Sequence, residues 1–290
     1  MNLYNQLKQK AFYSGSRVNV FIAINVIVFL VLSVAYVLQF LFVKQSTFSN
    51  LINSQLAVPA HLPTLLKQPW SIFTYMFMHD GFFHLLFNML WLYWLGTIFQ
   101  EYLNGKKLTF LYISGGLAGG ILYILSYNLF PAFADFTLTS KAVGASASVM
   151  AIVVATATLV PNYTISLLFL GPVKLKWIAL FYAVFDFISI VGPNAGGHIA
   201  HLGGAIFGFC FIKSLQNGND WSKPFETFFK PKPRLKVVVN NQNHASKNHN
   251  NPNQLEIDAI LDKISQTGYD KLSNQEKEIL FSASKANEEN

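Results

Sequence analysis

Long apolar stretches separated by short polar segments make up the first 215 residues of the chain. A helix that crosses a bilayer needs about 17–25 predominantly apolar residues, which is longer than most helices in soluble cores. Six such stretches can be drawn, at residues 18–43, 82–99, 108–129, 143–160, 177–191 and 198–212. The pattern predicts an all-α, polytopic membrane protein built around a bundle of six transmembrane helices.

The hydrophobic pattern changes after the sixth stretch. A polar segment rich in Asn, Lys and Pro predicts a linker, with basic residues near the membrane. Two amphipathic segments follow, separated by Gly268, and Ser273 and Glu276 have the spacing of a capping box. These segments predict a small cytoplasmic helical hairpin, whose partner the sequence does not name. The expected parts are a cytoplasmic segment (1–17), a membrane domain (18–215), a basic linker (216–250) and the hairpin (251–290).

The composition favours a membrane protein over a soluble one. Hydrophobic residues make up 52% of the chain and charged residues 12%, against about 25% charged residues in an ordinary soluble domain. The formal net charge of +7 arises in residues 1–215, where eleven basic residues face four acidic ones. Most of these basic residues lie in connecting segments, so we expect them to orient the chain in the bilayer and expect no nucleic acid partner.

The connecting segments also predict the topology. If the six stretches alternate across the bilayer, eight basic residues fall on one side and three on the other. Because cytoplasmic segments carry the excess of Lys and Arg, both termini are expected to be cytoplasmic. We expect a multi-pass protein of the cell membrane, the inner membrane of a bacterium, with the lipid bilayer as a partner.

Four polar residues recur at the same depth in three of the predicted helices. With cytoplasmic termini, the second, fourth and sixth stretches run inward, and His84, Asn88, Ser146 and His201 lie in or near their first turns. At about 1.5 Å of rise per residue, all four share one layer near the outer surface. Intramembrane polar residues are functional candidates, because an unpaired polar group in lipid is costly.

The surroundings of these residues suggest acyl chemistry. Small residues flank Ser146, which predicts an accessible nucleophile. His84 and Asn88 are spaced i, i+4 on one helix face, so together with the Ser146 N–H they suit an oxyanion hole. Gly204 and Gly208 lie at i+3 and i+7 from His201, where they would let the sixth helix approach the fourth.

His198 is the competing general base, one turn before His201. Its positions i+3 and i+7 are His201 and Ala205, which offer less room for close approach of the helices. His201 is therefore the favoured base.

The acidic residues do not predict a complete catalytic triad. The membrane part of the chain has four of them, Asp80, Glu101, Asp135 and Asp186. The first three fall in loops or near the inner face. We therefore expect a Ser–His dyad in which packing, and not a carboxylate, sets the tautomer of His201. The role of Asp186 stays open between a solvated or gating residue and a buried acid with a partner.

At these positions the chain resembles the rhomboid family of intramembrane serine proteases, over about residues 18–213. The motifs that carry the resemblance are His79…His84…Asn88, Gly144-Ala145-Ser146 and Ala200-His201…Gly204…Gly208. The resemblance implies Ser146 as the nucleophile and His201 as the general base. It also implies His84 and Asn88 as oxyanion donors and His79 as a structural histidine.

The chain departs from the family pattern at four positions. Ser71 follows Trp70 where the family has arginine, and Ala147 replaces the glycine that commonly follows the serine. Met150 stands where an aromatic residue often packs on the histidine, and Gln100 stands at a frequently acidic position. None of these departures removes a catalytic group, so activity is expected.

The preferred function is cleavage of transmembrane segments of other membrane proteins near the extracytoplasmic face. This chemistry requires no metal and no organic cofactor. The alternative is a catalytically silent rhomboid-like protein that binds membrane helices, which would need neither Ser146 nor His201. A transporter is less favoured, because the sequence has no internal repeat of the kind that builds central ion sites.

Overall fold

The computed structural model describes residues 15–42, 47–167, 171–228 and 254–288. The chain divides into two compact units, residues 1–231 and residues 232–290. We call them the bundle unit and the tail unit and describe each by itself.

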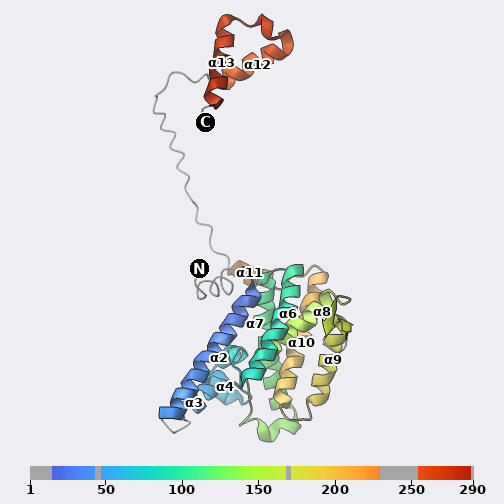
Figure 1. Ribbon diagram of the computed structural model, residues 1–290. Coiled ribbons are helices and arrows are strands. Elements are labelled where there is room, and N and C mark those ends of the chain that lie inside the picture. Colours follow the sequence, from blue (N-terminus) through green and yellow to red (C-terminus); the bar gives the residue numbers. More distant parts are fainter. Residues whose placement is uncertain (1–14, 43–46, 168–170, 229–253, 289–290) are drawn as a thin grey trace. The chain divides into compact units, whose positions relative to one another are not determined.

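Six helices of the bundle unit fall on the six stretches predicted from the sequence. They are α2 (Arg17–Phe42), α6 (Phe82–Tyr102), α7 (Gly105–Leu129), α8 (Ser146–Leu159), α9 (Leu175–Ser189) and α10 (Ala195–Gln216). They run roughly side by side, with α2 at one flank and α9 at the other (Figure 1).

Four of the described helices, α2, α6, α7 and α10, are long and apolar enough to cross a membrane. Helix α8 has only 14 residues, against the predicted range 143–160. At 1.5 Å per residue it is about 21 Å long, shorter than the hydrocarbon core of a bilayer. Ten of its residues are buried, so neighbouring helices and not lipid surround most of α8.

Glycine on α10 lets this helix lie directly against α8. A Cβ on Gly204 would lie 2.1 Å from the carbonyl oxygen of Ala147, and a Cβ on Gly208 would lie 2.2 Å from that of Ala151. Only glycine permits such an approach of two backbones. This contact places the first turns of α8 and α10 beside each other.

Helix α7 packs on α8 through a second pair of glycines. A Cβ on Gly115 would lie 2.3 Å from the Cβ of Ala151, and a Cβ on Gly119 would lie 2.5 Å from that of Ala147. The alanine that follows Ser146, where the family usually has glycine, is thus accommodated by Gly119 on the neighbouring helix.

The loop that leads into α8 is held by short elements at one end of the bundle. Strand β1 (Val58–Pro59) pairs antiparallel with β2 (Lys141–Ala142). The Gly144 N–H donates to the carbonyl oxygen of Tyr75 at 2.9 Å. The other short elements in the segments that connect α2 to α6 and α7 to α8 are α3 (Thr47–Leu56), α4 (Leu62–Lys67), α5 (Ser71–Thr74), η2 (Tyr75–Phe77) and η3 (Pro131–Phe136).

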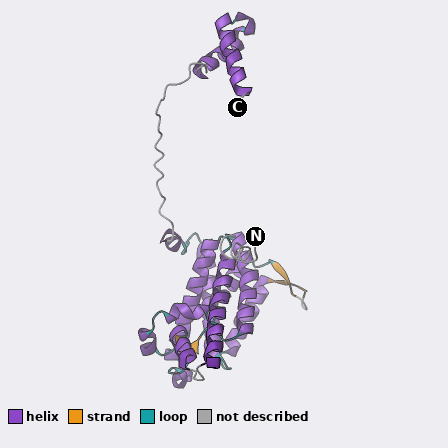
Figure 2. Cartoon of the chain, turned by 60° about the vertical axis from the view of Figure 1, so that its left-hand side comes forward, coloured by secondary structure: helices purple, strands orange, loops and turns teal. Residues whose placement is uncertain are grey.

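Segments predicted to share one side of the membrane meet at the other end of the bundle. The Arg17 N–H donates to Gln100 Oε1 at 2.9 Å, which joins the start of α2 to the end of α6. Tyr102 and Tyr163 make an edge contact with ring centroids 6.5 Å apart. A two-stranded hairpin, β3 (Thr164–Leu167) with β4 (Gly171–Lys174), connects α8 to α9 and is visible in Figure 2.

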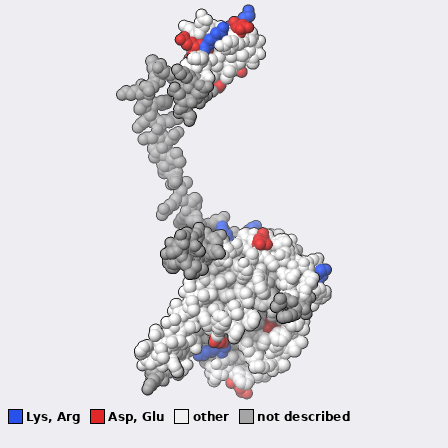
Figure 3. Space-filling view, in the orientation of Figure 1, with Lys and Arg blue, Asp and Glu red and all other residues white. Residues whose placement is uncertain are grey.

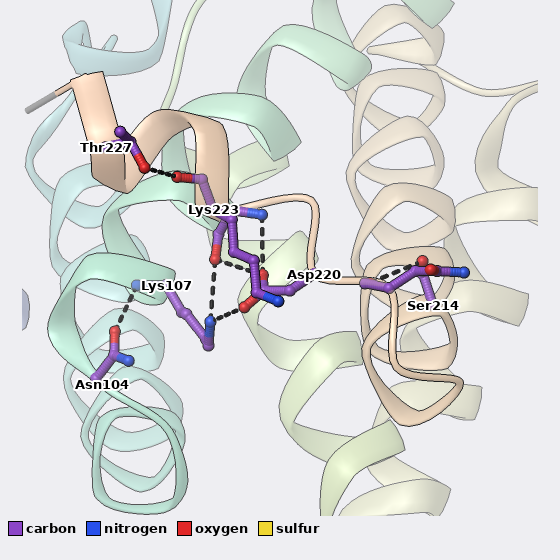
Figure 4. A network of polar contacts seen from close by, with 8 residues as sticks. Asn104, Lys107, Ser214, Asp220, Lys223 and Thr227 are labelled. Atoms are coloured by element: carbon purple, nitrogen blue, oxygen red, sulfur yellow. Dashed lines mark hydrogen bonds and ion pairs between the residues drawn. The ribbon is translucent and has the colours of Figure 1, made fainter.

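The first part of the predicted linker folds onto the bundle. Lys107, near the start of α7, forms an ion pair with Asp220 and donates to Ser222 Oγ at 3.1 Å (Figure 4). Helix α11 (Lys223–Phe228) follows, and the ring of Phe225 lies 5.8 Å from that of Phe110. The rest of the predicted linker, residues 229–253, lies outside the described residues.

The surface of the bundle unit fits a lipid environment. On the face drawn in Figure 3, a broad area of this unit carries no charged side chains. Helix α2 exposes large apolar residues, with Val31 62% and Phe40 80% exposed. Because soluble proteins rarely expose such continuous apolar surface, we conclude that the chain is a membrane protein.

The tail unit contains α12 (Gln254–Thr267), η4 (Tyr269–Lys271) and α13 (Asn274–Glu288). Gly268 ends α12 with a φ of +84°. The Ser273 N–H donates to Glu276 Oε2 at 2.7 Å and the Glu276 N–H to Ser273 Oγ at 3.3 Å, which is the capping box predicted from the sequence.

Candidate active site

A cavity of about 540 Å³ opens at the end of the bundle where α6, α8 and α10 begin. Ser146, His201, His84 and Asn88 all line it. The other lining residues are Asp80, Phe83, Phe87, Trp91, Lys141, Ala142, Val143, Val149, Met150, Val153, Tyr182, Asn194 and Gly197. Three helices therefore bring the four predicted polar residues to one cavity.

Ser146 is the first residue of α8. The first N–H groups of a helix have no intrahelical acceptor, so the Ser146 N–H is available to a ligand. Among the described residues, no hydrogen bond joins Ser146 Oγ to His201. Nucleophile–base hydrogen bonds are often long in unliganded sites and shorten when substrate binds.

Gly144 allows His84 to approach Ser146. Its φ of +126° is a conformation that favours glycine. A Cβ at this position would lie 2.9 Å from His84 Nε2 and 3.4 Å from Ser146 Oγ. The His84 ring and the Ser146 hydroxyl thus flank the same small space.

Asn88 lies one helical turn below His84. It is 7% exposed, and its Nδ2 donates to the carbonyl oxygen of His84 at 2.8 Å. The amide group carries two hydrogens on this nitrogen. One therefore remains for a ligand in the cavity.

A carboxylate contacts the predicted base, although the sequence predicted a dyad with no carboxylate beside His201. Asp186 Oδ1 lies 2.9 Å from His201 Nδ1 and 2.7 Å from His198 Nδ1. Asp186 comes from α9, whereas both histidines come from α10. His201 lines the cavity, and His198 is not among the described residues that line it.

Asp186, His198 and His201 also form a cluster of described residues that could hold a metal ion. Their ligand atoms lie within 4.8 Å of one another. In the structure, both Nδ1 atoms lie at hydrogen-bonding distance from Asp186 Oδ1.

His79 lies outside the cavity and contacts His84. The two ring centroids are 5.1 Å apart in an edge arrangement. Both ring nitrogens of His79 are buried without a hydrogen-bond partner. Burial and the neighbouring His84 lower its pKa from 6.5 to about 4, although the nearby Phe77 carbonyl partly opposes this shift. A neutral, buried ring agrees with a structural role.

Sequence reasoning left the role of Asp186 open and missed two other contributors to the site, Asn194 and Tyr182. Asp186 carried a usable signal, because an ionisable residue within a membrane helix is a functional candidate by default. Asn194 precedes α10 with a φ of 64°, and a Cβ on Gly197 would lie 2.5 Å from its side chain. Tyr182 of α9 meets Trp91 of α6 with ring centroids 5.2 Å apart. Nothing in the sequence singled out the last two contacts.

Comparison with known proteins adds information on both units. Residues 244–286 match a family of unknown function (DUF6576). RHOMBOID-like protein 12, mitochondrial, of Arabidopsis thaliana is 29% identical over 47% of this chain and 43% of its own length. RHOMBOID-like protein 6, mitochondrial, of the same plant is 27% identical over 54% of this chain and 48% of its own.

A bacterial relative matches a shorter stretch. Rhomboid protease GlpG of Salmonella newport is 36% identical over 58 residues, 20% of this chain and 21% of its own length. The chain thus spans less than half the length of each of these relatives. The Rhomboid domain profile matches residues 66–216, just over half of the chain and the part that holds the whole cavity. The chain therefore belongs to the rhomboid family.

Proposed function

We propose that the chain is an intramembrane serine endopeptidase that cleaves transmembrane segments of other membrane proteins near the extracytoplasmic face. One observation carries the proposal. Ser146, His201, His84 and Asn88 come from three helices and line one cavity. This constellation supplies a nucleophile, a base and oxyanion donors, which are the parts that acyl transfer needs.

The proposed reaction has two stages. Ser146 Oγ attacks the scissile carbonyl carbon while His201 takes the hydroxyl proton. His84, Asn88 and the Ser146 N–H hold the oxyanion. The C–N bond then breaks, His201 gives its proton to the leaving amine, and an acyl-enzyme remains. Water, activated by His201, hydrolyses the ester and restores Ser146.

The substrate is proposed to enter between α6 and α9. Phe87 of α6 is 58% exposed, and Phe185 of α9 is 50% exposed, so both helices present apolar side chains outward. Trp91 and Tyr182 contact each other between these helices and also line the cavity. Helical peptide bonds are shielded, so the substrate must unwind locally. Small or helix-breaking residues are therefore expected at the cleavage site.

The proposed topology has six spans in the cell (inner) membrane, with both termini in the cytoplasm. The meeting of Arg17, Gln100, Lys107 and Asp220 at one end of the bundle supports it. Reporter fusions at residue 17 and at the C-terminus should both report a cytoplasmic location. A non-cytoplasmic signal at either fusion point would exclude this orientation.

The function is tested by reconstitution into liposomes with a single-span substrate. Wild type should cleave, and Ser146→Ala and His201→Ala should not. His198→Ala is the matched control and should remain active, because His198 does not line the cavity. A fluorophosphonate probe should label wild type and not Ser146→Ala. The silent helix-binding alternative predicts substrate binding without labelling or cleavage, and that result would refute the proposal.

A further inference from the structure

Asp186 is a buried acid on α9, next to apolar residues that face outward. It is 2% exposed, whereas its neighbours Phe185 and Phe187 are 50% and 69% exposed. Burying a carboxylate is costly unless hydrogen bonds or opposite charges compensate it. The partners of Asp186 therefore explain why α9 can carry it.

Two histidines of α10 are those partners. One carboxylate oxygen, Oδ1, lies 2.7 Å from His198 Nδ1 and 2.9 Å from His201 Nδ1. The second oxygen, Oδ2, is buried and has no hydrogen-bond partner among the described residues. A carboxyl oxygen has two lone pairs and can accept from both rings, whereas a hydroxyl group at Oδ1 could donate to only one of them. Oδ1 is thus placed to accept the N–H groups of both rings.

The tautomer of His201 follows from this contact. When Nδ1 carries the proton and donates it to Asp186, Nε2 of a neutral ring has the free electron pair. The side chain of His201 is 25% exposed and lines the cavity, so packing leaves it partly unconstrained. The contact with Asp186 supplies the constraint on the His201 ring that packing lacks.

We propose that Asp186 is a positioning residue that holds His201 with Nδ1 protonated and Nε2 free to accept the Ser146 proton. This inference rests on the proposed protease function. When His201 becomes an imidazolium, the adjacent carboxylate also offsets the new charge. His198 Nδ1 lies 2.7 Å from the same oxygen, and His201 Nδ1 at 2.9 Å is the contact that the proposal uses. The site is then a Ser–His–Asp triad with a second histidine beside the carboxylate, and not a dyad.

The kinetic test compares Asp186→Asn, Asp186→Glu and Asp135→Asn in the reconstituted cleavage assay. In a serine protease triad, the Asp→Asn change lowers kcat by about 10⁴, and we expect a loss of about 10²–10⁴ for Asp186→Asn with KM unchanged. Asp186→Glu keeps the carboxylate and should recover part of the rate. Asp135 is exposed in η3, so its variant should match wild type. Equal kcat for wild type and Asp186→Asn would overturn the proposal.

A second measurement decides the proposal without reference to activity. Nitrogen NMR of isotopically labelled histidine rings reports which nitrogen carries the proton, and His198→Gln and His201→Gln assign two of the seven histidines. We expect the wild-type His201 ring to be protonated at Nδ1 and to change in Asp186→Asn. A wild-type ring protonated only at Nε2 would overturn the proposal, even if Asp186→Asn does not fold. If wild type fails to cleave while the tautomer is as expected, the protease function fails and the positioning role stands.

Discussion

His79 is a buried imidazole beside the proposed oxyanion residue His84. Its pKa in the folded protein is about 4, below the ordinary value of 6.5, because burial disfavours the charged ring. Between these two values the unfolded chain binds a proton that the folded chain does not. The contribution of His79 to the free energy of unfolding is therefore most favourable above about pH 6.5. It becomes less favourable as the pH falls towards 4.

We predict that His79→Leu flattens this pH dependence. Leucine fills the buried position without a titrating group and leaves no ring nitrogen unpaired. A shift of this size corresponds to at most about 3 kcal/mol. Thermal unfolding in detergent between about pH 7 and 4 measures it, because wild type should lose more stability than the variant over this window. Parallel curves for the two proteins would contradict the assignment.

At the scale of single elements, α8 is the shortest helix of the membrane bundle and the most enclosed. Ala147 and Ala151 on α8 lie against Gly204 and Gly208 on α10. The same contacts that exclude lipid from α8 also bring Ser146 and His201 to one cavity. Close packing and the proposed chemistry therefore depend on the same small side chains.

We predict that Gly208→Ala separates α10 from α8. The added Cβ would lie 2.2 Å from the Ala151 carbonyl oxygen, so the helices must move apart. Overpacking of this kind costs about 1–3 kcal/mol. A lower melting temperature and weaker fluorophosphonate labelling of Ser146 are expected. Gly81→Ala is the matched control, because a Cβ there meets nothing within 4 Å. Equal losses in both variants would show that the α8–α10 contact is not responsible.

At the scale of the whole molecule, the proposed site lies entirely within residues 1–231. Residues 217–228 belong to this unit through the Lys107–Asp220 ion pair and the contact of Phe225 with Phe110. Every described residue that lines the cavity belongs to the bundle unit, and the tail unit is a separate compact unit. Its match to a family of unknown function gives it no assigned role in cleavage.

Two truncations test this division. A chain that ends after Pro231 should cleave a single-span substrate as the full chain does, because every proposed catalytic residue remains. A chain that ends after Gln216 should melt at a lower temperature, because it loses the ion pair and the aromatic contacts of α11. Loss of cleavage on removal of residues 232–290 alone would show that the tail unit takes part in catalysis.

Properties that depend on local sequence could be predicted well. The six apolar stretches became six helices at the predicted places, since hydropathy and helix length act within one segment. The shared depth of His84, Ser146 and His201 followed from helix rise and from the order of the stretches. The capping box at Ser273 and the helix break at Gly268 likewise depend on only a few neighbouring residues.

The partner of Asp186 could not be predicted, because it depends on how two helices are rotated against each other. That rotation results from the packing of all their side chains and leaves no periodic signal in either helix. The same holds for the fold of residues 217–228. Their composition predicts a polar linker, whereas in the structure Asp220 contacts Lys107 and Phe225 contacts Phe110 on α7. Hydropathy along the chain thus predicted one depth for Ser146 and His201, which line one cavity, and packing between separate helices gave His201 a carboxylate.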